Sequence, residues 1–319
     1  MAIASMVTIL AFAQGTEKMV RVYEGNKVVF EQNYSDVDSI VFVDVDVPTT
    51  QKCALSGVFS VSATKKVNFS CGNLQASTTD FGEHWTWDFA TNQWDYIGNA
   101  VANNAINGNG TVSANGIVDL FGWSTEATYY GIDNTNDRDY QTYTGDFRDW
   151  GEHIGEGWYT LSIDEWVYLF RTRNGNKASI VNGTTGIRFA KAKVNSVSGV
   201  ILFPDGGTFN ENEFTTVAAL NAESSLEFTT CTANQWLALE EKGCVFLPAA
   251  GYRSCSYVYG IGSILGVYDV GSIGHYSSST PLSLFHSQFV SFDQNYVSPQ
   301  SNTYRCYGIS VRLVREVQE

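Results

Sequence analysis

Basic residues are scarce in this sequence. Its 319 residues include 19 Lys and Arg against 33 Asp and Glu, which gives a formal net charge of −14 and an isoelectric point near 4.6. The few basic residues are scattered along the chain rather than clustered. Because nucleic-acid phosphates are bound through clustered Lys and Arg, this composition argues against DNA or RNA as a partner.

Closely spaced cysteines are also missing. No Cys-x-x-Cys pair occurs, so the sequence offers neither a zinc-ligand spacing nor a thioredoxin-type redox motif. Free buried thiols and disulfides both remain open, because an exported chain can form disulfides and six cysteines allow 15 pairings. The six cysteines are Cys53, Cys71, Cys231, Cys244, Cys255 and Cys306.

Sequence signatures of catalysis are absent as well. The segment 262–266 has the wrong residue order for the Gly-x-Ser-x-Gly elbow of a serine hydrolase, and Gly260-Ile261-Gly262 precedes no expected helix, as a dinucleotide-binding loop would. We therefore expect no enzymatic activity. A carboxylate pair for glycoside hydrolysis stays open, because the ~5–9 Å separation of such a pair is a property of the fold. The four histidines form no cluster in sequence: His84, His153, His275 and His286.

A long apolar run is confined to the start of the chain. Residues 1–13 (MAIASMVTILAFA) end in Ala11-Phe12-Ala13, the small-x-small pattern of a signal-peptidase site. This predicts export with Gln14 as the mature N-terminus, although no Lys or Arg precedes the apolar run; the alternative is a buried N-terminal strand. No Cys follows the site, so a lipoprotein anchor is not indicated. No other segment has the ~18 apolar residues of a transmembrane helix.

Strand patterns dominate the rest of the sequence. Residues 14–52 predict a small β unit with a linker: strand patterns at 19–24 and 27–32 flank the turn-forming pair Gly25-Asn26, another pattern covers 39–47, and 47–52 is typical of a linker. Residues 53–319 form the second expected domain, whose strands are separated by polar loops at 103–115 and 133–145. Its expected strands include 57–63, 66–72, 85–90, 186–194, 199–204, 244–250 and 307–317.

Two segments are predicted to be helices. In 162–170, Ser162 and Glu165 form the Ser-x-x-Glu capping box, in which each side chain satisfies a free backbone N–H group of the first turn. The second helix, 232–242, begins with a Thr-x-x-Gln box and ends at Gly243. Two helices among many short, irregular, mostly antiparallel strands predict an α+β fold.

Several of these segments resemble a known fold. The segment WYTLSIDEWVYLF (158–170) resembles the helix motif L-[PS]-x-x-E-W-x-[YF] of the formylglycine-generating-enzyme branch of the C-type lectin fold. The ending YGISVRLV (307–314) is similar to that fold's closing G-F-R strand, here with Ile309-Ser310 between the Gly and the Val-Arg pair. Segments 57–75, 119–123, 201–205 and 245–253 are similar to parts of exported Bacteroidetes proteins built on this fold.

The resemblance covers roughly residues 53–315 and implies a function. Some of those exported proteins are variable proteins of diversity-generating retroelements, which use the C-type lectin fold to present a hypermutated ligand-binding face. Members that oxidise cysteine use a close thiol pair near the C-terminus; the nearest candidates here, Cys255 and Cys306, lack that spacing. The Glu-Pro-Asn signature of sugar-binding C-type lectins is also missing. The resemblance therefore implies a binding protein, with a formylglycine-type oxidase as the less favoured reading.

One acidic loop raises the question of calcium. Asp133, Asp137, Asp139, Asp146 and Asp149 are carboxylates of the kind that hold Ca²⁺, but their spacing departs from the D-x-[DN]-x-[DN]-G loop. A solvated acidic loop is the favoured interpretation, and we expect no cofactor.

The composition of the C-terminal region is the most informative feature. From Tyr252 to Arg315 there is no Lys, Glu, Trp or Met, although these types make up 36 of the 319 residues and about seven would be expected in 64 residues. Residues 252–310 hold 13 Ser and 8 Tyr, the chemistry of antibody paratopes. Randomising the adenines of AAC or AAT codons would also give this composition, since it cannot produce Lys, Glu, Trp or Met. The run Leu282-Ser283-Leu284-Phe285-His286 fits such an origin, and large apolar groups in a loop are typical of an interaction site.

We therefore predict a variable recognition face within 252–310. Two alternatives stay open: a fixed adhesive or glycan-binding face that uses the loops around Trp85, Trp87, Trp94 and Trp123, and a plainly structural region. Core packing is expected for Val258, Val267, Val270, Phe289, Val290, Phe292, Val311 and Leu313. The predicted ligand-binding residues are Ser254, Ser256, Tyr257, Tyr259, Ile273, His275, Ser277, Leu282, Ser283, Leu284, Phe285, His286, Ser291, Asp293, Tyr296, Ser298, Ser301, Thr303, Cys306 and Ile309.

The expected function is thus that of a secreted or surface-displayed protein that binds an external protein or glycan through this face. Specificity would come from Tyr, Phe and Leu anchors with Ser and Asn hydrogen bonds around them.

Overall fold

The chain divides into two compact units, Met1–Thr49 and Thr50–Glu319. A computed structural model describes the chain in parts. The predicted signal segment, the strand at 39–47, the linker and most of both polar loops lie outside the described residues. The structure describes the backbone of 19–24 and 27–33, and describes 53–98, 103, 115–125, 130–132, 145–224, 227–254 and 266–317 in full.

The first unit contains a two-stranded antiparallel sheet. Strand β1 (Met19–Glu24) pairs with β2 (Lys27–Asn33), with a register shift between Val22 and Tyr23. These strands lie where the alternating apolar pattern predicts them.

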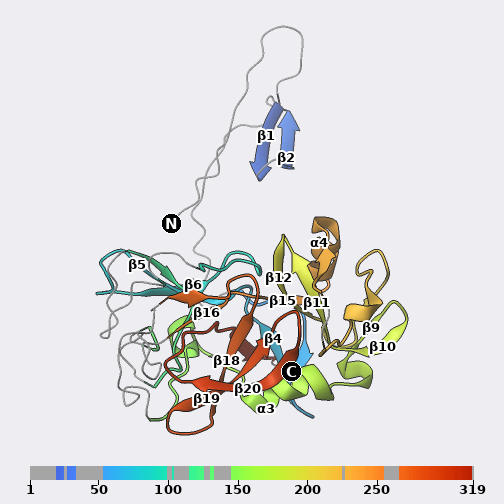
Figure 1. The fold of residues 1–319 in the computed structure, drawn as a ribbon. Helices are drawn as coiled ribbons and strands as arrows, with labels where there is room; N and C mark the ends of the chain where they lie inside the picture. Colours follow the sequence, from blue (N-terminus) through green and yellow to red (C-terminus); the bar gives the residue numbers. More distant parts are fainter. Residues whose placement is uncertain are drawn as a thin grey trace. The chain divides into compact units, whose positions relative to one another are not determined.

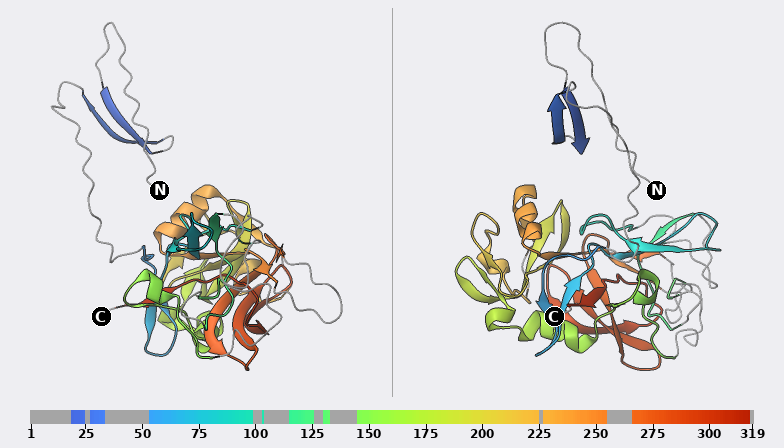
Figure 2. Two further views of the ribbon diagram at one scale, coloured as in Figure 1. Left: turned by 90° about the vertical axis from the view of Figure 1, so that its left-hand side faces the viewer. Right: turned by 180° about the vertical axis from the view of Figure 1, so that it is seen from behind.

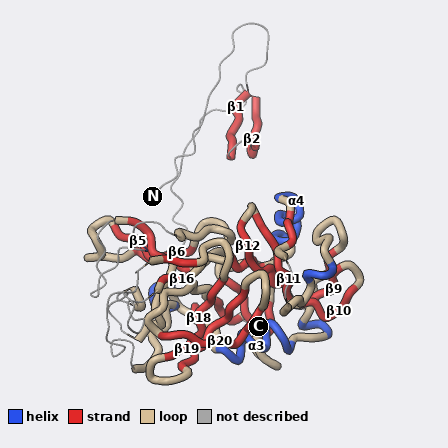
Figure 3. The backbone as a smooth tube through the Cα atoms, in the orientation of Figure 1, coloured by secondary structure: helices blue, strands red, loops and turns tan. Residues whose placement is uncertain are grey.

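The second unit is a mixed fold of mostly short antiparallel strands with few helices among the described residues. Figure 3 shows how much of it is loop. Among the described strands, parallel ladders join β11 with β14 and β9 with β13, and two isolated bridges, Gly251 with Gly274 and Tyr276 with Ser310, are also parallel. In spatial order its sheets are β3 (Phe59–Ser60), β4 (Lys66–Phe69), β21 (Val314–Glu316) and β8 (Trp158–Tyr159); β6 (Thr86–Phe89), β5 (Leu74–Thr78) and β7 (Gly116–Val118); β10 (Thr184–Ile187), β9 (Ser179–Val181) and β13 (Thr208–Phe209); β14 (Thr229–Cys231), β11 (Phe189–Val194), β12 (Val197–Leu202) and β15 (Val245–Pro248); β16 (Tyr252–Arg253) and β17 (Val267–Tyr268); and β18 (Gly274–Pro281), β19 (His286–Phe292) and β20 (Val297–Tyr304).

Both predicted helices form, and each begins with its predicted capping box. Helix α3 (Ile163–Val167) is capped by Ser162 and continues as a π-helical turn, Tyr168–Thr172. Helix α4 (Ala233–Glu241) is capped by Thr232 and ends just before Gly243, whose φ of 84° favours glycine. The sequence reasoning missed α2 (Gly151–Ile154), because a helix of four residues shows no periodicity.

Three large apolar clusters form most of the core among the described residues of the second unit. The central cluster packs α3 and the strands β18 to β20 against β4, β11, β12 and β15. A second cluster lies under β5 to β7, and a third lies between α4 and the sheet of β11 and β12. Figure 1, and the view from behind in Figure 2, place the strands β18 to β20 between β5–β6 on one side and the sheet under α4 on the other. Among the predicted core residues, Val270 is half-buried, Val258 is not described, and the others are buried.

The last part of the chain joins many elements. Residues 308–316, here called the closing segment, exchange backbone hydrogen bonds first with Arg253, then with Phe121, then with β18. The next residues accept from the N–H groups of Leu74 and Ser70, and β21 then pairs with both β4 and β8. The predicted strand 307–317 is therefore regular only over β21, because its earlier residues bond successive neighbours instead of one strand.

A buried ion pair fixes the start of the sheet around β3. Arg173 is fully buried, and its guanidinium donates to the Asp205 carboxylate at 3.0 Å and to the carbonyl oxygens of Leu169 and Phe203. Asp205 also accepts from the Ser60 N–H at 2.9 Å, so both charges are hydrogen bonded on several sides.

The described helices are all too short or too polar to cross a bilayer.

Replacing Asp205 by Ala is expected to lower the free energy of unfolding by about 3–5 kcal/mol, because Arg173 would remain buried without its counter-charge. Chemical denaturation measures this change. The matched control is Glu223→Ala, which breaks an ion pair to Arg171 whose side chains are 45% and 37% exposed; that variant is expected to lose less than about 1 kcal/mol. Equal losses in the two variants would contradict the buried pair.

Candidate functional site

The turn between β18 and β19 is held in one conformation. The N–H groups of Leu282 and Ser283 donate to the carbonyl oxygen of His286 at 2.9 and 3.1 Å. The Ser283 hydroxyl accepts from the N–H groups of Phe285 and His286 and lies 3.0 Å from His286 Nδ1. Residues 282–285, the hairpin tip, therefore form an ordered turn.

Large apolar side chains on the hairpin tip face solvent. Leu282 is 50% exposed, Leu284 57% and Phe285 37%. Nothing in the hydrogen bonding of the turn requires apolar residues at these positions, because the bonds come from the backbone and from Ser283. An ordered turn that displays three such side chains has the form of a binding anchor.

Arg305 supports the hairpin tip from beneath. Its backbone N–H donates to the Phe285 carbonyl oxygen at 2.9 Å, and its Nε to that of His286 at 3.4 Å. Its guanidinium lies over the Trp123 ring at 4.1 Å. Trp123 is fixed in turn, since its Nε1 donates to the Ser278 carbonyl oxygen at 2.8 Å. The tip thus rests on a cation–π pair within the fold.

Aromatic side chains form a continuous row beside the tip. The ring of His286 lies 4.5 Å from Tyr304, and Tyr304 lies 6.1 Å from Tyr307. Tyr307 stacks on Tyr252 at 5.7 Å, and Tyr252 contacts Tyr268 at 5.9 Å. All five residues are half-buried, so each is partly accessible. This aromatic row extends the apolar surface of the tip.

The sequence reasoning did not single out the four tyrosines of the aromatic row. The abundance of Tyr within 252–310 was the available signal, but alternation within short strands did not show which Tyr faces outward. Tyr276 shows the difficulty, because it is completely buried, and its hydroxyl donates to the Pro248 carbonyl oxygen.

The predicted contact residues divide by burial. Twelve are at least partly accessible, while Ser256, Tyr257 and Tyr259 lie outside the described residues. The exposed ones are Leu282, Ser283, Leu284, Phe285 and Tyr296, and the half-buried ones are Ile273, His275, His286, Asp293, Ser298, Ser301 and Thr303. The structure corrects the remaining five, which are buried and therefore not displayed at the surface: Ser254, Ser277, Ser291, Cys306 and Ile309.

His275 lies against the inner side of the aromatic row. It stacks on Tyr252 at 5.4 Å and meets Phe289 edge-on at 4.7 Å. Its Nδ1 is buried and has no hydrogen-bond partner among the described residues. Burial lowers the pKa of His275 to about 4, so the ring is neutral near pH 7.

A separate cavity of about 400 Å³ opens beside α4. Its aromatic walls are Trp94 and Trp236, whose rings meet edge-on at 6.5 Å. Of the four tryptophans predicted for a glycan-binding face, Trp94 alone lines this cavity; Trp87 and Trp123 are buried in the core and Trp85 is half-buried.

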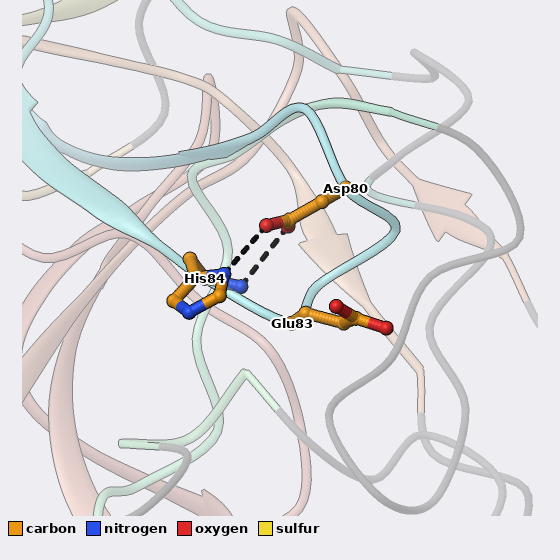
Figure 4. A group of neighbouring side chains, drawn as sticks. All are labelled: Asp80, Glu83 and His84. Atoms are coloured by element: carbon orange, nitrogen blue, oxygen red, sulfur yellow. Dashed lines mark hydrogen bonds and ion pairs between the residues drawn. The ribbon is translucent and has the colours of Figure 1, made fainter.

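Asp80, Glu83 and His84 form the one metal-type cluster among the described residues (Figure 4). The Asp80 carboxylate is hydrogen bonded within its own turn. It accepts from the backbone N–H of His84 at 3.0 Å and lies 2.7 Å from His84 Nδ1. These hydrogen bonds lower the pKa of Asp80 to about 2, and the neighbouring carboxylate raises the pKa of His84. A hydrogen-bonded surface turn accounts for the cluster.

The acidic loop is described only in its last part. Asp133, Asp137 and Asp139 lie outside the described residues. The Asp149 carboxylate is hydrogen bonded within the fold. It accepts from the backbone N–H groups of Thr160 and Gly151 and from the Thr160 hydroxyl at 2.9–3.0 Å.

Cysteine pairing is partly decided. Cys306 is disulfide-bonded, whereas Cys53, Cys71, Cys231 and Cys244 are free thiols. Cys306 is therefore neither a ligand contact nor a reactive thiol in this structure.

Comparisons with family models, curated proteins and solved structures found nothing that matches this chain. The function must be argued from the geometry above.

The depressed pKa of His275 predicts a pH effect. Because the folded state disfavours the protonated ring, stability is complete above the unfolded-state pKa of about 6.5 and is lost as the pH falls toward 4, by up to about 3 kcal/mol. His275→Phe is expected to keep the ring packing and to flatten this acid loss, as measured by denaturation between pH 7 and 4.

His84→Asn is the matched control. The pKa of His84 is raised, so its stabilising contribution is present below the unfolded-state pKa and is lost at higher pH. Removing His84 should therefore make the acid loss steeper. An unchanged pH profile in His275→Phe would contradict the buried neutral ring.

Proposed function

We propose that this protein binds an external ligand through the hairpin tip and the aromatic row, on a C-type-lectin-like scaffold. The observation that carries the proposal is the ordered turn with three exposed apolar side chains, Leu282, Leu284 and Phe285. Other exposed large apolar side chains among the described residues, such as Phe81, Val217 and Leu237, lie far apart in sequence, whereas the tip displays three within four residues. Such a concentration is typical of a surface that a partner covers.

The chemistry of the face favours a protein or glycan partner. Tyr rings give broad contact area with little loss of side-chain entropy, and the Ser and Thr residues of β20 supply adaptable hydrogen bonds. No Lys or Glu interrupts the region from Tyr252 to Arg315. The face therefore recognises shape and hydrogen bonding rather than a strongly charged group.

A secreted or surface-displayed location agrees with this role. The signal-like segment 1–13 predicts export, and a disulfide-bonded Cys306 is typical of an oxidising compartment. The scaffold assignment rests on the capped helix α3 and the closing segment, which carry the motifs that resemble the formylglycine-generating-enzyme branch. The sequence motifs favour a binding protein over an enzyme.

Binding to an array of extracellular proteins and glycans tests the proposal. Leu282→Ser with Leu284→Ser is expected to weaken any wild-type binding by at least about tenfold, since each buried Leu contributes about 1.5–3 kcal/mol. Val217→Ser is the matched control, because Val217 is 53% exposed and lies outside the face. Equal binding by the tip variant and the control would contradict the proposal.

Glycan binding at the cavity beside α4 is the second candidate function. The observation in its favour is the pair of indole walls, Trp94 and Trp236, since aromatic rings stack on sugar faces. The same array separates the two functions. Loss of glycan signals in Trp94→Ala, with retention in the tip variant, would favour the cavity.

The variable version of the proposal predicts a pattern in the gene. Across related cells, differences within 252–309 should fall on adenine-derived codon positions and concentrate on accessible residues such as Leu282, Leu284 and Tyr304. Sequencing the locus measures this. Differences that are spread evenly over codon positions, or that occur equally at buried residues such as Val290, would contradict the variable version. The face would then have a fixed specificity.

A further inference from the structure

Two free cysteines face each other at the start of the second unit. Ala54 and Ser70 form an antiparallel bridge, so the register places Cys53 directly opposite Cys71. The Leu55 N–H donates to the Phe69 carbonyl oxygen at 2.8 Å, and the Cys71 N–H donates to the Cys53 carbonyl oxygen at 3.0 Å. The pairing therefore continues on both sides of the bridge and holds the two cysteines in register.

This pairing has the spacing that a disulfide needs. Directly opposed residues of an antiparallel pair have Cα atoms about 4.5–5.5 Å apart, and disulfides join Cα atoms about 4.4–6.8 Å apart. The two thiols also interact: burial and the neighbouring Cys53 thiol raise the pKa of Cys71 to about 12. The register therefore meets the Cα spacing that a disulfide requires.

The two cysteines differ in solvent exposure. Cys53 is exposed and can meet an oxidant, whereas Cys71 is half-buried and packs against the core cluster under β5 to β7, together with Ala54 and Trp85. By contrast, Cys244 is completely buried and Cys231 is 5% exposed. Among the described free thiols, Cys53 is thus the one most open to reaction.

We propose that Cys53 and Cys71 form a disulfide that clamps the entry of the chain into the second unit. A second observation supports it, because Cys306 is already disulfide-bonded in this protein. An environment that oxidises one pair of cysteines also oxidises another pair held in register.

The reaction balances by thiol–disulfide exchange with a disulfide oxidant such as oxidised glutathione. The Cys53 thiolate attacks one sulfur of the oxidant, which forms a mixed disulfide and releases one thiol. The Cys71 thiolate then attacks the Cys53 sulfur and releases the second thiol. Two electrons and the two thiol protons pass from the cysteines to the oxidant.

The clamp fixes the residues that begin the domain. The loop that it closes, 53–71, contains β3 and β4, and β4 pairs with β21 of the closing segment. Detachment of residues 53–60 from the edge of the domain, starting at Cys53, would then require the Cys53–Cys71 disulfide to break. This consequence concerns stability alone, so it is independent of the ligand-binding proposal.

Peptide mapping of the full-length protein tests the clamp directly. The protein is equilibrated with oxidised and reduced glutathione under conditions in which Cys306 stays bonded, unfolded in the presence of iodoacetamide, and digested without reduction. Besides the bond that Cys306 keeps, we expect one cross-linked pair of peptides, which contain Cys53 and Cys71, with Cys231 and Cys244 alkylated. Alkylated Cys53 and Cys71, or a link from either one to another cysteine, would overturn the proposal.

Stability provides a second measurement. Oxidised wild-type protein is expected to unfold at a temperature on the order of 5–10 °C higher than Cys53→Ser. Cys53→Ser keeps the buried Cys71 and its packing, so it is the variant least prone to misfold. Cys231→Ser is the control, and its Tm should still fall when the 53–71 bond is reduced. A Tm of wild type that does not change on oxidation would also count against the clamp.

Discussion

The backbone hydrogen bonds of the closing segment are the constraint on which the rest of the second unit depends. Over nine residues the segment bonds to Arg253, Phe121, β18, the residues around β5, β4 and β8 in turn. Arg312 is buried within it and donates to Gln93 Oε1 at 2.9 Å, while Gln93 accepts from the Phe246 N–H. Because these bonds join segments far apart in sequence, they hold many short strands together where no single sheet is large enough to do so.

This frame explains how an apolar hairpin tip can remain ordered while exposed. The closing segment bonds β18 at one end, and Arg305 bonds the turn at the other. Between them, β19 buries Phe289, Val290 and Phe292 in the core, so the hairpin is anchored along its length. Pre-organisation of this kind lowers the entropy lost when a ligand binds. The same frame fixes the aromatic row, because Tyr307 lies next to the closing segment.

The features that could be predicted from the sequence are those that depend on residues close together along the chain. The capping boxes at Ser162 and Thr232 depend on residues three apart, so both helices were predictable. Strand patterns located β4, β11, β12 and β15, among others, but no strand was predicted at β18, β19 or β20. The exposed turn was also visible, because apolar residues after Pro281 break the pattern of a polar loop. The path of 308–313 and the burial of Ser277 or Ser291 depend on partners far along the chain. Ser is compatible with either environment, and only the tertiary pairing decides between them.

A scan of every substitution across 266–317, displayed on cells and scored by protease resistance, tests the central claim most directly. If the closing segment provides the stability and the tip only displays side chains to a ligand, polar and charged residues at positions 282, 284 and 285 should lower protease resistance very little. In contrast, Ser310, Arg312 and Leu313 accept almost none. Protease sensitivity at the tip as severe as that in the closing segment would contradict the account, because the tip would then be part of the core.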